Sequence, residues 1–421
     1  MASLDTSGLV EMRRDLHEHP EPGWCEFRTT AVVAERLREL GFDVAVGPEA
    51  VELTGAERRP DEETIERRAS RAIEYGVDPE LVSELREGGT GVVGTLDRGE
   101  GSVLGLRVDM DALDVQESDD ADHRPEAEGF RSRHDGEMHA CGHDGHTAIG
   151  LGVAERFAED DSFEGTLKLF FQPGEEGWGG GRAMAATDHL DDVDRLLAVH
   201  LGLDAPSGTV VTGVEFLTVS GFTVDFSGTS AHAGAAPHEG NNALLAATTA
   251  TQNVYAIPRH SGGVTRINVG ELESGTAANV VPESATMSVE TRGGTNELND
   301  YVEERMREAV TGAAESHGVD VSITKRGTTI SVPHDPEIAE AVADAVTDVS
   351  GVETVEPHRA VPGGEDACFL LKRVRETGGE ATHLLVGADL ADGHHTARFD
   401  FDEGVLDIAV RTLSAGLRDA C

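Results

Sequence analysis

The chain has 421 residues, 38% of them hydrophobic, so it can bury a large core and is long enough for two domains. It carries 79 acidic and 34 basic residues, a formal net charge of −45 that excludes nucleic acid and anionic membranes as partners. Lysine stands only at Lys168, Lys325 and Lys372. So acidic and lysine-poor a surface predicts a salt-rich, halophilic setting, because at ~1 M salt the Debye length falls to roughly 3 Å and like charges are screened.

The sequence shows neither a membrane span nor a secretory signal. No apolar run approaches the ~20 residues that a transmembrane helix needs, and the first twenty residues lack the charged-then-apolar profile of a signal peptide. The four cysteines (Cys25, Cys141, Cys368 and Cys421) are scattered and form no disulfide framework. We therefore expect a soluble, cytoplasmic protein.

The N-terminal part reads as helical. A first helix is predicted over about Leu9–His19, ending at Pro20, and a longer amphipathic one over Thr29–Leu40, before Gly41. Residues 56–89 are highly charged and only weakly periodic. They predict an exposed, partly helical insertion without a function of its own.

Apolar runs that read as strands follow, with a helix predicted over about Gly145–Phe157. The predicted strands are Gly91–Leu96, Val103–Val108, Thr166–Phe171, Arg195–Val199 and Thr382–Val386. This alternation is typical of an α/β fold, with a mixed central sheet flanked by helices. Polar groups come directly after three of the strands: Asp109 and Asp111, then Glu175 and Glu176, then His200. Because open α/β sheets bind ligands at the carboxyl ends of their strands, we expect these groups to meet at one edge.

The middle of the chain changes rhythm. Its predicted elements are strands Phe216–Phe226, Val264–Leu272, Ala285–Thr291 and Val319–Thr324, with helices Asn241–Ala256 and Glu297–His317. The order β-α-β-β-α-β is that of a ferredoxin-like unit. We therefore predict a catalytic domain of residues 1–204 and 327–421, interrupted by a ferredoxin-like domain of residues 205–326.

The stretch His139–His146 carries the strongest chemical signal. With Glu175, Glu176, His200 and His395 it offers one thiolate, several imidazoles and two adjacent carboxylates. That inventory suits two divalent metal ions with one carboxylate left for proton transfer. Sulfur and nitrogen ligands favour zinc, while carboxylates also admit manganese or cobalt. A metal-assisted hydrolase is the leading interpretation.

At these residues the chain resembles the M20 family of metallopeptidases, in its amidohydrolase branch of hippurate, N-acyl-amino-acid and auxin-conjugate hydrolases. The resemblance covers nearly the whole chain. Its motifs are Arg13-Arg14-Asp15-Leu16-His17 through Pro20-Glu21, Asp109-Met110-Asp111-Ala112-Leu113, His139–His146, Gln172-Pro173-Gly174-Glu175-Glu176-Gly177, Gly228-Thr229-Ser230-Ala231-His232-Ala233, Gly275–Pro282, Gly364-Glu365-Asp366 and His395–Phe399.

The resemblance implies a role for each matching residue. The implied ligands of two metal ions (zinc, manganese or cobalt) are Cys141, His143, Glu176, His200 and His395. The register to Arg398-Phe399 selects His395, and His394 is the alternative. Glu175 is the implied general base, and Asp111 the carboxylate that orients a metal-bound imidazole. Asp109 stands where other branches place a histidine ligand.

In the middle domain the resemblance implies that His232, Asn279 and Arg292 bind the substrate's carboxylate and the oxyanion of the reaction. An ordinary surface salt bridge is an equally good interpretation of Arg292. The middle domain would then be a lid and the interface of a homodimer.

We therefore predict a metal-dependent amidohydrolase that cleaves the amide bond of an N-acyl amino acid or a related conjugate. Three alternatives stay open: a carboxypeptidase or aminoacylase of the same family acting on peptides; a hydrolase with Cys141 as nucleophile and His143 or His146 as base; and a catalytically idle metal-binding protein. Chelators separate the metal-dependent hydrolases from the cysteine hydrolase, since only the latter would stay active without metal.

Overall fold

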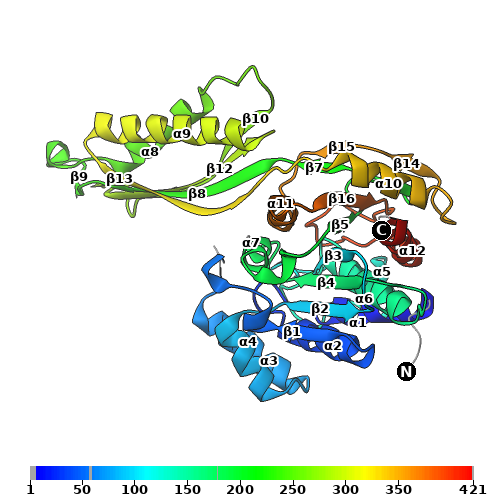
Figure 1. Ribbon diagram of the computed structural model, residues 1–421. Helices are drawn as coiled ribbons and strands as arrows, with labels where there is room; N and C mark the ends of the chain where they lie inside the picture. Colours follow the sequence, from blue (N-terminus) through cyan, green and yellow to red (C-terminus); the bar gives the residue numbers. More distant parts are fainter. Residues whose placement is uncertain (1–5, 56–58, 178, 420–421) are drawn as a thin grey trace. The chain divides into compact units, whose positions relative to one another are not determined.

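A computed structural model describes residues 6–55, 59–177 and 179–419 (Figure 1). It divides into two compact units. The first contains Met1–Glu215, Val332–Val361 and Asp366–Cys421; the second contains Phe216–Ser331 and Pro362–Glu365. The domain boundaries predicted above, after residues 204 and 326, stay a prediction. Each unit is described below by itself.

The first unit is built on an eight-stranded mixed sheet with the order β1-β2-β4-β3-β5-β16-β6-β14. Its strands are β1 (Asp43–Val46), β2 (Val92–Asp97), β3 (Val103–Asp109), β4 (Thr166–Gln172), β5 (Arg195–Leu201), β6 (Thr209–Val211), β14 (Thr354–Glu356) and β16 (Glu380–Val386). The pairs β4–β3, β3–β5 and β5–β16 are parallel, whereas β2 runs antiparallel to both β1 and β4. The predicted α/β fold with a mixed central sheet is confirmed. A short ladder joins β7 (Val214–Phe216) to β15 (Arg359–Val361).

Helices cover this sheet (Figure 1). They are α1 (Thr6–Glu18), α2 (Phe27–Glu39), α5 (Arg124–Glu128), α6 (His143–Ala158), α7 (Gly180–Ala185), α10 (Pro336–Val346), α11 (Cys368–Thr377) and α12 (Val405–Asp419). Helix α6 is buried on almost every side. Its glycines permit this: a Cβ at Gly150 would lie 2.8 Å from Phe171 of β4, and one at Gly152 would lie 2.7 Å from Val410 of α12. The helix is therefore clamped between sheet and α12, which fixes its first turn at the ends of β3 and β4.

The prediction of an exposed insertion at residues 56–89 is wrong for the part that the structure describes. Helices α3 (Glu62–Glu74) and α4 (Pro79–Gly88) form there, capped by the side chains of Asp61 and Asp78. Their apolar side chains are few, but they share one face, and Ile65, Val82 and Leu85 are buried together with Cys25 and Phe27. Residues 56–58 lie outside the described residues. The charged composition hid a small core of its own.

The second unit contains a four-stranded antiparallel sheet with the order β10-β12-β8-β13. Its elements are β8 (Thr218–Ser227), α8 (Ala243–Tyr255), β10 (Thr265–Ser274), β12 (Ser284–Gly293), α9 (Asn296–His317) and β13 (Asp320–Thr329). Helices α8 and α9 pack on the sheet, and their buried side chains share one core with Phe222, Val224 and Met287. A further pair of two-residue strands, β9 (Ala231–His232) and β11 (Val280–Val281), was not predicted. Among the described helices of the whole chain, none is long and apolar enough to cross a bilayer.

Candidate metal centre

Three neighbouring parallel strands bring the predicted polar groups to one place. Asp109 ends β3, the Glu175-Glu176 pair follows β4, and His200 lies near the end of β5. The loops are locked together, since the backbone N–H of Glu176 donates to Asp111 Oδ2 at 2.9 Å. The expectation that these groups meet at the carboxyl edge of the sheet agrees with this geometry.

His143 begins helix α6, directly after Gly142, whose φ of +91° suits glycine. Its Nδ1 lies 3.2 Å from Asp111 Oδ1, while its buried Nε2 has no hydrogen-bond partner among the described residues. Burial alone would lower the pKa of His143, but the carboxylates of Asp109, Asp111 and Glu176 outweigh it and raise the pKa to about 10. The surroundings of this imidazole are thus strongly anionic. A metal ion on Nε2 would supply the positive charge that they favour.

Cys141 is shared by two groups of metal-binding side chains. One group is Cys141, His200 and His394, the other Cys141, Glu176 and His395, with ligand atoms within 4.8 Å of one another in each. Cys141 Sγ lies 3.6 Å from His200 Nε2, and His200 Nδ1 donates to the carbonyl of Leu201 at 2.7 Å. Burial, then the carboxylates of Glu176 and Glu175, raise the pKa of the Cys141 thiol well above its usual range. The thiolate form therefore needs a cation beside it.

Both histidines of the pair His394-His395 approach this site. His395 adopts a left-handed backbone conformation, with φ +63°, and its N–H donates to the carbonyl of Ala140 at 2.8 Å. Its Nε2 lies 3.0 Å from Glu176 Oε1. The Nε2 of His394 is buried and has no hydrogen-bond partner among the described residues. The preferred ligand and the alternative are thus both within reach of Cys141.

The two adjacent glutamates face the same region. His143, Glu175 and Glu176 form a third group with ligand atoms within 4.8 Å of one another. Glu175 is only partly buried, so water can reach it beside the buried ligands. One carboxylate can bind metal while the other accepts a proton from water.

His146, by contrast, has both ring nitrogens engaged. Its Nδ1 lies 2.5 Å from Asp109 Oδ1, and its Nε2 accepts the N–H of Leu201 at 2.9 Å. Asp109 is also paired with Arg107, at 2.8 Å. His146 therefore has no lone pair to offer as a base for Cys141, which argues against one form of the cysteine-hydrolase alternative.

Sequence reasoning missed two carboxylates that hold the loop after β4. Glu26 Oε1 accepts the N–H of Gly174 at 2.7 Å, and burial, then the nearby charge of Asp111, raises its pKa to about 8. Asp366 Oδ2 accepts the N–H of Gly181 at 2.8 Å, at the start of α7. Glu26 is a single acidic residue before a helix, with no spacing that marks it. Asp366 lay in a recognised motif, but nothing in the motif indicated this anchoring.

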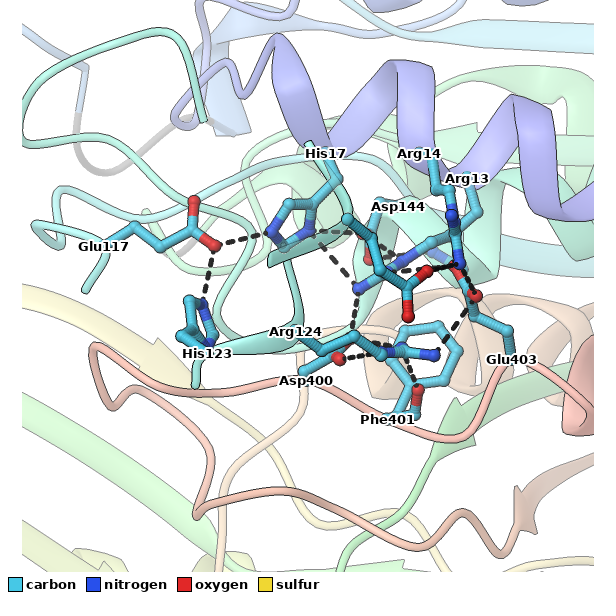
Figure 2. A network of polar contacts seen from close by, with 12 residues as sticks. Arg13, Arg14, His17, Glu117, His123, Arg124, Asp144, Asp400, Phe401 and Glu403 are labelled. Carbon is cyan, nitrogen blue, oxygen red and sulfur yellow. Dashed lines mark hydrogen bonds and ion pairs between the residues drawn. The ribbon is translucent and has the colours of Figure 1, made fainter. Parts of the chain in front are cut away.

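A buried network of ion pairs explains the Arg13–His17 motif (Figure 2). Arg13 pairs with Asp144 at 2.8 Å, Asp400 at 2.9 Å and Glu403 at 3.2 Å. His17 Nδ1 lies 2.8 Å from Asp144 Oδ2, and its Nε2 lies 3.1 Å from Glu117 Oε1. Helix α1 is thereby tied both to the first turn of α6, beside His143, and to the segment that follows His395.

The three predicted substrate-binding residues belong to the second unit. His232 lies in β9, exposed, and its Nδ1 accepts the N–H groups of Gly234 and Ala235 at 3.1 and 3.0 Å. The carbonyl of Asn279 accepts the N–H of Ala233 at 2.9 Å, so His232 and Asn279 lie on adjoining segments. Arg292 pairs with Glu290 at 2.6 Å and donates to the carbonyl of Pro362 at 2.7 Å, which is the salt bridge that was its alternative interpretation.

Comparison with known proteins identifies the family. The model of peptidase family M20/M25/M40 matches residues 105–419. The chain is 45% identical over 410 residues to a p-aminobenzoyl-glutamate hydrolase of Escherichia coli, covering 96% of this chain and 94% of that protein. It has the same identity and coverage with indole-3-acetyl-aspartic acid hydrolase of Enterobacter agglomerans.

Solved structures agree. An aminobenzoyl-glutamate utilization protein from Klebsiella pneumoniae matches with a TM-score of 0.79 and 38% identity, over 98% of this chain and 95% of that one. A dinuclear metal binding M20 peptidase from Bacillus subtilis matches with a TM-score of 0.71 and 25% identity, over 98% of this chain and 97% of that one. The chain therefore belongs to peptidase family M20/M25/M40 and is a metal-dependent hydrolase that acts on amide bonds.

Proposed function

We propose that the enzyme cleaves the amide bond between an acyl group and an acidic amino acid. The two relatives at 45% identity are named for p-aminobenzoyl-glutamate and indole-3-acetyl-aspartic acid. Both compounds are amides of an aromatic acyl group with glutamate or aspartate. The likeness spans 96% of this chain, so it extends over both units.

The observation that carries the proposal is the pair of ligand groups sharing Cys141, with His143, Glu175 and Glu176 beside them. We assign Cys141, His143, Glu176, His200 and His395 as ligands of two divalent ions: zinc, manganese or cobalt. Such ions, when bound, acidify a water molecule and polarise the scissile carbonyl. Glu175 takes the proton of the attacking water and delivers it to the nitrogen of the leaving amino acid. Asp111 fixes the orientation of His143 through its 3.2 Å contact.

A cavity beside Glu176 supports an acidic substrate. It has a volume of about 480 Å³, and its lining includes Glu176, Leu113, Arg59, Pro60 and Arg68. The charge of Arg68 is taken up by Asp114 and Glu137. Arg59 donates to the carbonyl of Arg86 at 3.0 Å but pairs with no carboxylate among the described residues. A guanidinium in this state suits the side-chain carboxylate of a bound glutamate or aspartate.

The second unit has the element order and strand order of a ferredoxin-like domain. We propose that it is a lid whose His232, Asn279 and Arg292 bind the substrate carboxylate and the oxyanion, with Arg292 leaving Glu290 for the substrate. We also propose a homodimer through this unit, because Leu244, Leu245 and Tyr255 of α8 are large exposed apolar side chains. Light scattering of Leu245→Glu beside the wild type tests the dimer; an unchanged mass would contradict it.

The decisive experiment for the reaction is Glu175→Gln, with Glu100→Gln at an exposed position as matched control. We expect the first variant to keep its bound metal and to lose 10²–10⁴-fold in kcat, about the contribution of a general base. The control should behave like the wild type. Wild-type turnover by Glu175→Gln would remove this residue from the mechanism.

A substrate panel separates the remaining alternatives. It compares p-aminobenzoyl-glutamate and indole-3-acetyl-aspartate with acetyl and benzoyl derivatives of neutral amino acids and with short peptides. A carboxypeptidase is a serious competitor, since thermostable carboxypeptidase 1 of Saccharolobus solfataricus is 27% identical over 95% of this chain. Preference for peptides would favour that reading. Preference for acidic conjugates, lost selectively in Arg59→Gln, would support ours.

The panel belongs in high salt. We propose that the net charge of −45 adapts the enzyme to salt-rich surroundings, where the mutual repulsion of its carboxylates is screened. Circular dichroism during dialysis should show a sharp loss of structure at low salt. Full stability there would refute the adaptation without touching the catalytic proposal.

A further inference from the structure

A second group of metal-binding side chains lies in the first unit, outside the candidate centre. Glu215, His334 and His358 present ligand atoms within 4.8 Å of one another. Glu215 Oε1 lies 3.1 Å from His334 Nδ1, and its Oε2 lies 3.3 Å from His358 Nε2. The carboxylate is thus held between two imidazoles, and no residue of the proposed mechanism takes part.

Backbone structure brings these three side chains together from distant parts of the chain. Glu215 lies in β7, and His358 lies just before β15, with which β7 pairs. The hydrogen bonds from Thr212 N to the Glu356 carbonyl (3.0 Å) and from Arg359 N to the Gly213 carbonyl (3.0 Å) fix this register. His334 comes from the segment before α10. The convergence therefore does not depend on the side chains alone.

Gly213 makes room for one of the imidazoles. A Cβ at this position would lie 2.7 Å from His334 Cδ2 and 2.8 Å from its Nε2. Such contacts are closer than van der Waals distance, so the ring of His334 lies directly on the glycine. The ring is also largely buried, with its side chain 15% exposed. A side chain at residue 213 would push His334 away from Glu215.

The donor set and its spacing suit a transition-metal ion. At zinc, bonds of about 2.0–2.2 Å and tetrahedral angles place neighbouring ligand atoms about 3.3 Å apart, close to the 3.1 and 3.3 Å found between carboxylate and imidazoles. Two imidazoles and a carboxylate are a common zinc set, with water as the fourth ligand. The exposure of His358, 49% of its side chain, leaves a path for the ion and that water.

We propose that Glu215, His334 and His358 bind one divalent transition-metal ion, zinc by preference, in addition to the ions of the catalytic centre. The site is structural. Glu215 is the last residue before the chain leaves the first unit, and His334 follows closely after its return at Val332. An ion held by these ligands cross-links β7, the segment before α10 and the β14–β15 turn. Direct hydrogen bonds between the histidines and Glu215 are the competing explanation, and they require no metal.

Metal counting separates the two explanations. Wild type, His358→Ala, Glu215→Gln and a control, His238→Ala at an exposed position of the second unit, are dialysed against buffered micromolar zinc in high salt. Metal content per chain is then measured. We expect both site variants to bind one ion fewer than the wild type, and the control to match it. Equal metal content in wild type and site variants would overturn the proposal. Glu215→Gln covers the case in which His358→Ala fails to fold.

Two further readouts keep this site distinct from the catalytic one. His200→Ala should lose catalytic metal but keep the ion that His358→Ala loses; loss of the same ion in both variants would overturn the assignment. With Co²⁺ as probe, the proposed site should contribute only weak d–d absorption, because it has no thiolate, whereas Cys141 would add an intense charge-transfer band. Zinc should also raise the unfolding temperature of His200→Ala but not of the His200→Ala/His358→Ala double variant. Failure of the catalytic proposal would alter none of these differences.

Discussion

His143 and Asp144 are consecutive residues at the start of α6, yet their side chains enter two different buried polar clusters. Asp144 joins the network of Arg13, Asp400 and Glu403 (Figure 2). His143 joins the cluster of Asp111, Cys141 and Glu176. The clusters share one helical turn, but their charges are balanced in different ways.

In the first cluster the chain supplies its own cations. Arg13 and Asp144 have fully buried side chains and lie 2.8 Å apart. Burial alone would raise the pKa of Asp144, but Arg13 and His17 hold it well below its usual range. Arg124 adds a second guanidinium, 2.5 Å from Asp400. This cluster is complete as folded, and nothing in it calls for a ligand.

In the second cluster the carboxylates and the thiol outnumber the cations that the described residues provide. The nearby guanidinium of Arg107 pairs with Asp109. The consequences are the raised pKa of His143 and the raised pKa of Cys141. The comparison teaches that the residue types alone do not separate a structural cluster from a chemical one. The missing positive charge does.

Metal removal should therefore give the largest difference between the two clusters. Dialysis against a chelator in high salt should abolish amide hydrolysis, while far-UV circular dichroism stays native because the Arg13 network is intact. Zinc, manganese or cobalt should restore turnover, and the best of them identifies the working metal. Activity that survives complete removal of metal would revive the Cys141 nucleophile.

Breaking the first cluster should instead cost stability. Arg13→Gln leaves Asp144, Asp400 and Glu403 buried without their shared cation, and removal of one partner from a buried ion network typically destabilises a protein by about 3–5 kcal/mol. Urea unfolding in high salt measures the loss. Arg305→Gln, which removes an exposed pair with Glu308, is the control and should unfold like the wild type. A similar midpoint for Arg13→Gln would mean that the network is not needed.

Acid should weaken the same network. Burial raises and the arginines lower the pKa of Asp400 and Glu403, and the net direction is downward for both. A carboxyl group with a lowered folded-state pKa stabilises the protein above its unfolded-state pKa, about 4, and this contribution is lost as pH falls through the folded value. Urea midpoints between pH 6 and pH 3 should therefore fall less steeply for Asp400→Asn than for the wild type. Equal slopes would contradict the assignment.

The sequence predicted the second cluster far better than the first. Asp109, Asp111, Glu175, Glu176 and His200 each follow or end an apolar strand, and parallel strands gather such positions at one edge. The choice of His395 over His394 needed the motif register, and the structure brings both to Cys141.

The network could not be predicted, because its partners have no pattern in the sequence. Arg13 and Glu403 are separated by 390 positions, and only the packing of α1 and α12 against α6 brings them together. The same holds for Glu215, His334 and His358, which converge through the β7–β15 ladder. Helices α3 and α4 were underestimated for another reason: charged side chains cover a small apolar face.

The smallest effect is expected at the rim of the network, and it tests whether burial sets the size. Arg14 approaches Glu403 at 2.6 Å and Glu128 at 2.7 Å, as close as any pair around Arg13, but its side chain is 28% exposed. Water and salt screen such a pair, so Arg14→Gln should cost only about 0.2–1 kcal/mol. Urea unfolding beside Arg13→Gln makes the comparison directly. If Arg14→Gln proved as costly as Arg13→Gln, short distance rather than burial would govern this cluster, and the contrast drawn between complete and incomplete buried charge would lose its basis.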